Sequence, residues 1–111
     1  MELLGTIEPN TEVATGKPEW IRLIEAHPEL SPVPPKEGIN PFTRDPYLYR
    51  ARPDTARVVA EVGQLGLIEW AQDESRRLVV WSNPGSEAKV RSIAEDVAST
   101  LGWRFVLHNA P

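Results

Sequence analysis

The fold is decided by residues 77–102, which read RLVVWSNPGSEAKVRSIAEDVASTLG. The continuous apolar run within 77–82 predicts a short strand in the interior of a sheet, buried on both faces. After the turn-forming residues 83–86, apolar residues recur at the spacing of one helical face. They are Val90, Ile93, Ala94, Val97, Ala98 and Leu101. Gly102 is well placed to end this helix, so the sequence predicts a strand that leads into an amphipathic helix.

Three more short runs of strand-like residues flank this unit. They lie at 57–62, 67–72 and 103–107, with turns expected at 63–64 and 73–76. In the first run, alternation places Val58, Ala60 and Val62 on one face. Three strands therefore precede the helix, and one follows it.

The N-terminal part predicts a strand and a second helix. Glu2 to Ile7 is a possible short strand. A helix is expected next, capped by Thr15 and ended by Pro28. Its buried stripe consists of Trp20, Leu23, Ile24 and His27.

These elements predict an α+β fold with two helices on one face of an antiparallel or mixed sheet of four to five short strands. The expected order is β-α-long loop-β-β-β-α-β, which is close to a ferredoxin-like split βαβ arrangement with one additional strand. A length of 111 residues is typical of one domain, so residues 1–111 are expected to form a single α+β domain.

Residues 28–53 form a proline-rich segment, here called the strap. It holds seven of the 11 prolines, and each proline removes a backbone donor. Regular structure is therefore not expected. Because the strap also carries apolar and aromatic residues, the sequence predicts an ordered, irregular segment packed on the core. Long loops of this kind in small domains are commonly functional or disordered.

Composition and charge exclude several function classes. The chain has no cysteine, which excludes thiol catalysis and cysteine-ligated zinc. No apolar stretch approaches the ~20 residues of a membrane helix, and no secretory signal is visible, so a cytoplasmic protein without membrane contact is expected. The net charge of −4 opposes general binding to nucleic acid, so nucleic acid is not expected as a partner.

The sequence contains no convincing catalytic or metal-binding pattern. His27 belongs to the buried stripe at the end of the first predicted helix, where it is expected to act as a capping residue. His108 lies three residues from the C-terminus, which is an improbable place for catalysis. We therefore predict no catalytic residue, no metal site and no cofactor.

The strongest functional signal lies in the strap, where arginines alternate with aromatic residues. From Phe42 to Arg57, four arginines and two aspartates give a local charge of +2, which leaves −6 for the rest of the chain. Arginine and tyrosine are enriched at the centres of protein interfaces. The candidate partner-binding residues are Phe42, Arg44, Tyr47, Tyr49, Arg50 and Arg52. The alternative is structural: the tyrosines hold the strap on the core, and the arginines pair with nearby carboxylates.

Three functions are compatible with these observations. The first is a non-enzymatic protein-binding module that uses the strap and the adjoining sheet edge. An inhibitor or immunity-type protein that captures a basic partner by charge complementarity is one example. The second is a small enzyme or ligand-binding domain with a pocket between the strap and the sheet, for which the candidate residues are Arg44, Tyr47, Tyr49 and His27. The third and weakest is binding of single-stranded nucleic acid, with bases stacked on tyrosine.

Overall fold

A computed structural model describes residues 1–10, 15–33, 36–49, 53–71 and 76–108, and for 36–37 and 47–49 it describes the backbone alone. The fold is α+β, with a six-stranded antiparallel sheet and two helices. The helices are α1 (Lys17–Ala26) and α2 (Glu87–Leu101). The strands are β1 (Glu2–Pro9), β2 (Leu30–Pro32), β3 (Lys36–Ile39), β4 (Pro46–Tyr49), β5 (Thr55–Ala60), β6 (Gly63–Trp70), β7 (Leu78–Ser82) and β8 (Trp103–Leu107).

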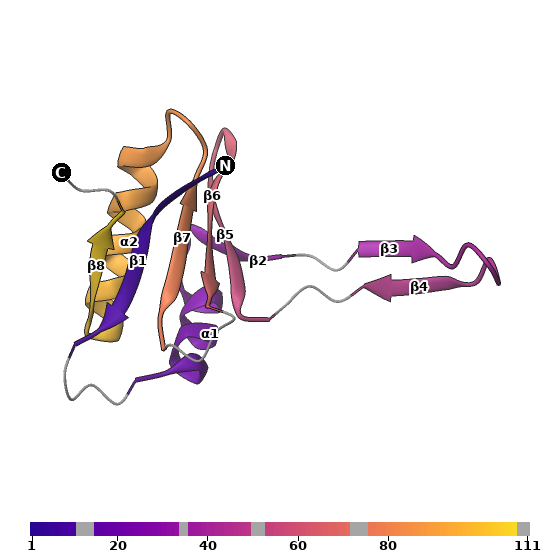
Figure 1. Cartoon of the computed structure of the whole chain (residues 1–111), viewed down its shortest axis with the longest axis horizontal. Helices are drawn as coiled ribbons and strands as arrows, with labels where there is room; N and C mark the ends of the chain where they lie inside the picture. The colour runs from indigo at the N-terminus through magenta and orange to yellow at the C-terminus, as the bar shows by residue number, and fades with distance from the viewer. Residues whose placement is uncertain (11–14, 34–35, 50–52, 72–75, 109–111) are drawn as a thin grey trace.

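The large sheet has the strand order β2-β5-β6-β7-β1-β8, and every neighbouring pair is antiparallel. Both helices lie on one face of it (Figure 1). The core forms between that face and the helices, and its fully buried members include Ile7, Trp20, Ile68 and Val97. The sheet has more strands than the four to five expected, because part of the strap joins it as β2.

The strand and helix of 77–102 are confirmed. All six apolar residues of the predicted helical face are buried in α2. Gly102 follows the helix in the left-handed conformation, with φ of 75°, which glycine adopts without a steric penalty. Strand β7 lies in the interior of the sheet, as predicted. Only one of its faces is fully buried, however, because the helices cover one side of the sheet and leave Val79 and Trp81 half-buried on the other.

Helix α1 begins one residue later than a Thr15 cap would place it. Gly16 is its N-cap, and the Gly16 N–H donates a 2.9 Å hydrogen bond to Oε2 of Glu19. The Thr15 hydroxyl instead donates to the Leu101 carbonyl at the end of α2, at 2.7 Å. The same hydroxyl accepts from Nε1 of Trp103 at 2.8 Å, so Thr15 links the chain to α2 and β8.

The Glu19 contact predicts an acid-dependent loss of stability. The hydrogen bond from the Gly16 N–H, aided by the backbone N–H of Glu19 and by Arg22, lowers the pKa of the Glu19 carboxyl below its ordinary value of 4.5. A lowered pKa in the folded state stabilises the protein above the ordinary value, and this stabilisation is lost as the pH falls through the folded value. Glu19→Gln is therefore expected to flatten the dependence of Tm on pH between neutral pH and about pH 3. An unchanged slope in this variant would contradict the assignment.

The β5–β6 hairpin turns earlier than the sequence indicated. Its turn is at 61–62, and Ala60 pairs with Gly63, which has φ of 122°. Val62 was expected in a strand, on the same face as Val58, but it lies in the turn and is 88 % exposed, whereas Val58 is buried. The predicted register failed because the positive-φ glycine directly follows the turn, whereas the sequence suggested that it lies within the turn.

The strap is the largest correction. It was expected to be irregular and packed on the core, yet it contains three strands. β2 pairs with β5 at the edge of the large sheet, and β3 and β4 form a separate antiparallel pair. In Figure 1 this β3–β4 hairpin projects away from the large sheet, along the long axis of a molecule that measures 50 × 33 × 26 Å.

The prolines allow these strands because they avoid the positions that must donate. Asn40 N–H bonds to the Asp45 carbonyl, so the next pair, Ile39 and Pro46, is one whose N–H groups point outward. Pro32 is similarly placed. The Val59 N–H donates to the Glu29 carbonyl, and from that hydrogen-bonded pair the hydrogen-bonded and non-hydrogen-bonded pairs alternate along β2 and β5. Pro32 therefore lies in a non-hydrogen-bonded pair with Ala56. Proline is tolerated at such edge positions.

Candidate functional site

The tip of the β3–β4 hairpin is a loop held by its own hydrogen bonds. Oδ1 of Asn40 accepts from the N–H groups of Phe42 at 2.9 Å and Thr43 at 3.3 Å. The Asn40 carbonyl accepts from the Arg44 N–H at 2.7 Å, and the Thr43 hydroxyl accepts from the Asp45 N–H at 3.3 Å. Asparagine commonly organises turns in this way, and the ring of Pro41 fixes its own φ at a value that suits the position after Asn40. The loop is therefore ordered without help from the large sheet.

This loop presents an exposed aromatic ring. Phe42 is 93 % exposed, the largest exposed fraction among the large hydrophobic residues that the structure describes. Ile39, at the end of β3, is 68 % exposed. A phenylalanine normally buries its ring, and burial of such a side chain is worth ~1.5–3 kcal/mol. Two apolar side chains at the end of a projecting hairpin are typical of a contact surface.

Arg44 has an unusual backbone conformation next to this ring. Its φ of 62° is the only positive value of a non-glycine residue in the described part of the chain. Such conformations are uncommon for arginine and are concentrated at functional sites. Arg44 is exposed, and its guanidinium makes no ion pair or hydrogen bond with any residue described.

The structure locates only some of the predicted site residues. Phe42 and Arg44 lie in the tip loop. The backbones of Tyr47 and Tyr49 pair with Gly38 and Lys36 in the hairpin, while Arg50 and Arg52 lie outside the described residues. Asn40, which organises the loop, was not among the predicted site residues. Its signal was available, since Asn-Pro between two short runs of apolar and aromatic residues is a turn pattern.

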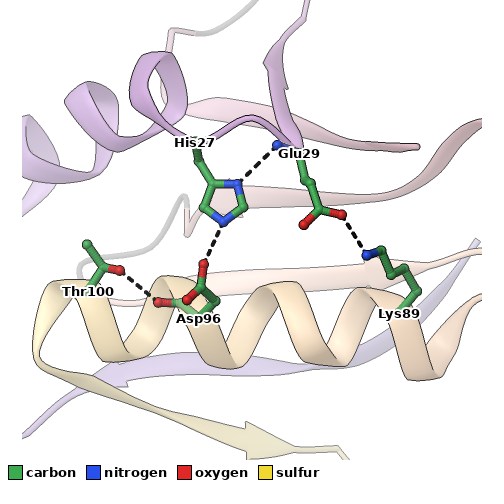
Figure 2. Close-up of polar contacts among 5 residues, drawn as sticks. All are labelled: His27, Glu29, Lys89, Asp96 and Thr100. Carbon is green, nitrogen blue, oxygen red and sulfur yellow. Dashed lines mark hydrogen bonds and ion pairs between the residues drawn. The ribbon is translucent and has the colours of Figure 1, made fainter. Parts of the chain in front are cut away.

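His27 is engaged in a polar contact between the two helices (Figure 2). Its Nδ1 accepts from the Glu29 N–H at 3.1 Å, so Nε2 carries the hydrogen that is donated to Oδ2 of Asp96 at 2.6 Å. Lys89 on α2 pairs with Glu29 at 2.7 Å and adds a second link between the same segments. Since both ring nitrogens are occupied, neither is available to accept a proton from a nucleophile or to bind a metal. The expected capping position is correct, but the contact partner is Asp96.

Other chemistry-bearing groups are dispersed. No group of three potential metal ligands occurs among the residues that the structure describes. His108 is exposed, and its backbone N–H bonds to the Leu4 carbonyl at 2.9 Å. In the same described ranges, no helix is both long and apolar enough to cross a membrane.

Comparisons with known proteins give no match: no family model, no curated protein and no solved structure resembles the chain.

Proposed function

We propose that this protein is a non-enzymatic protein-binding module that inserts the tip of its β3–β4 hairpin into an apolar pocket of a partner protein. The observation that carries the proposal is the 93 % exposed ring of Phe42 on a loop whose hydrogen bonds are internal. Because the loop is already ordered, binding costs little conformational entropy there. The burial of Phe42 and Ile39 then supplies the favourable term.

Charge indicates the character of the rim around that pocket. The stretch from Phe42 to Arg57 has a local charge of +2 in a chain of −4. Arg44, beside the exposed ring, can offer a forked guanidinium to a carboxylate. We infer that the partner's pocket has carboxylates at its rim. The narrower role as an inhibitor or immunity-type protein stays a prediction, because it depends on the identity of the partner.

The position of the hairpin in the chain supports a recognition role. We propose that β1, α1, β6, β7, α2 and β8 form a ferredoxin-like core, whose strands follow the spatial order β8-β1-β7-β6. Residues 27–62 are then an insertion between α1 and β6. It adds β2 and β5 to one edge and carries the hairpin outward (Figure 1). An insertion can supply a binding loop while the core supplies stability.

The enzyme alternative has less support. It required a pocket between the strap and the sheet, but the hairpin projects away from that sheet (Figure 1). Both nitrogens of His27, one of the residues proposed for that pocket, have hydrogen-bond partners. The single-strand alternative depended on the two tyrosines as stacking platforms, and no observation of the structure favours it.

Phe42→Ala is expected to reduce partner affinity by about tenfold to a hundredfold, as aromatic hot-spot residues do. Because the ring is exposed, the Tm is expected to change little. The experiment is quantitative affinity capture from the native organism with the wild-type protein and each variant. Val62→Ala is the matched control, since it removes an equally exposed apolar side chain from a turn in the large sheet. Capture of the same proteins in the same amounts by Phe42→Ala would overturn the proposal.

A further inference from the structure

The large sheet has a second face, which neither helix nor the β3–β4 hairpin covers in Figure 1. Residues directly opposite each other in antiparallel strands share a face, so the strand register defines its members. Helix-facing pairs include Ile68 with Val80 and Ile7 with Leu78, all fully buried. The residues between them form the second face, here called the open face. They include Leu3, Thr6, Leu67, Glu69, Val79 and Trp81.

The open face is apolar at its centre. Leu67 and Leu3 both pair with Trp81, which places three large side chains in one row across β6, β7 and β1. Val79 is in the adjacent row, between Glu69 and Thr6, and Val106 on β8 extends that row and is 40 % exposed. A solvated face of an antiparallel sheet usually carries polar residues at these positions. A contiguous apolar patch on an uncovered face is typical of an interaction surface.

Charged residues of both signs flank this patch. Arg57 and Arg104 are basic, and Glu8 and Glu69 are acidic, with Glu8 directly opposite Arg104. Glu69 also accepts from Nε1 of Trp81 at 3.0 Å, which fixes the indole on the face. A surface for nucleic acid or anionic lipid would carry an excess of basic residues. A rim that carries both signs instead lets two copies of a chain of charge −4 approach each other at this face, because each sign can find its opposite.

The dimensions of the face are also suitable. Six strands spaced ~4.8 Å apart, with about six residues of ~3.4 Å each, give a flat footprint on the order of 500 Å². Pleating and side chains make the accessible area larger than the footprint, so it approaches the ~800 Å² per partner of a standard interface. The hairpin extends beyond the edge of the sheet and leaves the face free (Figure 1).

We propose that the open face packs against the open face of a second copy of this chain, which forms a two-fold symmetric dimer with two stacked sheets and the helices outside. Antiparallel sheets pack in this way when each presents an apolar face. Leu67, Trp81 and Val79 lie at the centre of the contact. This surface is separate from the hairpin tip, so the dimer would present two copies of the binding loop.

The test is the molecular mass of the purified protein by sedimentation equilibrium, at concentrations up to about a hundredfold above a micromolar Kd. We expect a dimer for the wild type. Val79→Lys places like charges against each other at the centre of the contact and is expected to give a monomer. Ala88→Lys adds the same charge to the exposed side of α2 and is expected to remain a dimer.

Thr6→Lys provides a second disruption of the same face, because Thr6 lies beside Val79 and is only half-buried. If circular dichroism shows that Val79→Lys does not fold, the molecular mass of Thr6→Lys is used in its place. A monomeric wild type over the whole range would overturn the proposal. A dimer that persists in folded Val79→Lys or Thr6→Lys would also overturn it, since the contact would then use another surface. Phe42→Ala is expected to remain a dimer, which separates this proposal from that of the hairpin.

Discussion

Trp20→Ala is expected to destabilise the protein by about 3–5 kcal/mol, the usual cost of removing a buried tryptophan. Trp20 on α1 is completely buried and is the largest of the fully buried side chains. Its indole Nε1 donates a 2.8 Å hydrogen bond to the Asp54 carbonyl, immediately before β5. A typical domain has a free energy of unfolding of only about 5–15 kcal/mol, so this loss is a large part of the total.

The measurement is urea or thermal unfolding, and a decrease in Tm of roughly 10 to 25 °C is expected. Trp20→Phe is the control, because it keeps an aromatic ring in the core and removes the indole N–H. Its effect should be clearly smaller, since the Asp54 carbonyl still accepts from the Trp70 N–H at 3.1 Å. Equal losses in the two variants would mean that the hydrogen bond, and not the volume of the ring, determines the contribution of Trp20.

Gly66→Ala is expected to cost about 1–3 kcal/mol or more, which is the range for inserting a methyl group into a packed core. Gly66 lies in β6, between Val58 of β5 and Ser82 of β7. An added Cβ would collide with the Trp81 carbonyl oxygen and would approach the two methyl groups of Val90 on α2 at 3.1 and 3.3 Å. The backbone of Gly66 is not in the left-handed region, so the requirement for glycine is close packing between the sheet and the helix.

Gly16→Ala is the matched control for this substitution. A Cβ at Gly16 meets nothing closer than 3.9 Å, and its φ of −144° suits any residue. Its cost is expected to be about 0.5–1 kcal/mol, which is the usual difference between glycine and alanine at an N-cap and is smaller than the cost of a steric collision in the core. If both variants lose the same stability in urea unfolding, the approach of α2 to β6 is not as tight as described.

The parts of the fold that were predicted correctly are those with a strong periodic signal. Helix α2 shows six apolar residues on one face over four turns, and a glycine ends it. The stripe of α1 and the interior position of β7 were equally clear. These signals arise from local geometry and burial, which a single sequence records directly.

The prediction of an irregular strap was wrong because it considered the number of prolines and not their positions in the strands. A proline interrupts a strand only where the residue at its position would have to donate an N–H to the neighbouring strand. Which positions must donate depends on how the strands pair. Pro32 and Pro46 both face away from their partner strands, and Pro41 lies in the turn. The identity of the partner strand was not visible in the sequence.

Only part of the candidate site was predicted, because its arrangement also depends on contacts that form only in the folded chain. Phe42 and Arg44 were selected by residue type, and both lie in the projecting loop. Their arrangement depends on Asn40, whose role appears only when the loop is closed. The open face was not predicted either. The apolar run of β7 indicated that both faces of the strand are buried, but it gave no information about what would cover the second face.

The self-contained hydrogen bonding of the hairpin tip has an evolutionary consequence. Because Asn40 and Thr43 hold the loop and the side chains of Phe42 and Arg44 make no hydrogen bond within it, positions 42 and 44 can change with little penalty in folding. Selection at those positions acts on recognition alone. Orthologues should therefore diverge fastest at the tip while they retain Asn40 and the packed glycine beneath α2, so that new specificities arise on an unchanged scaffold.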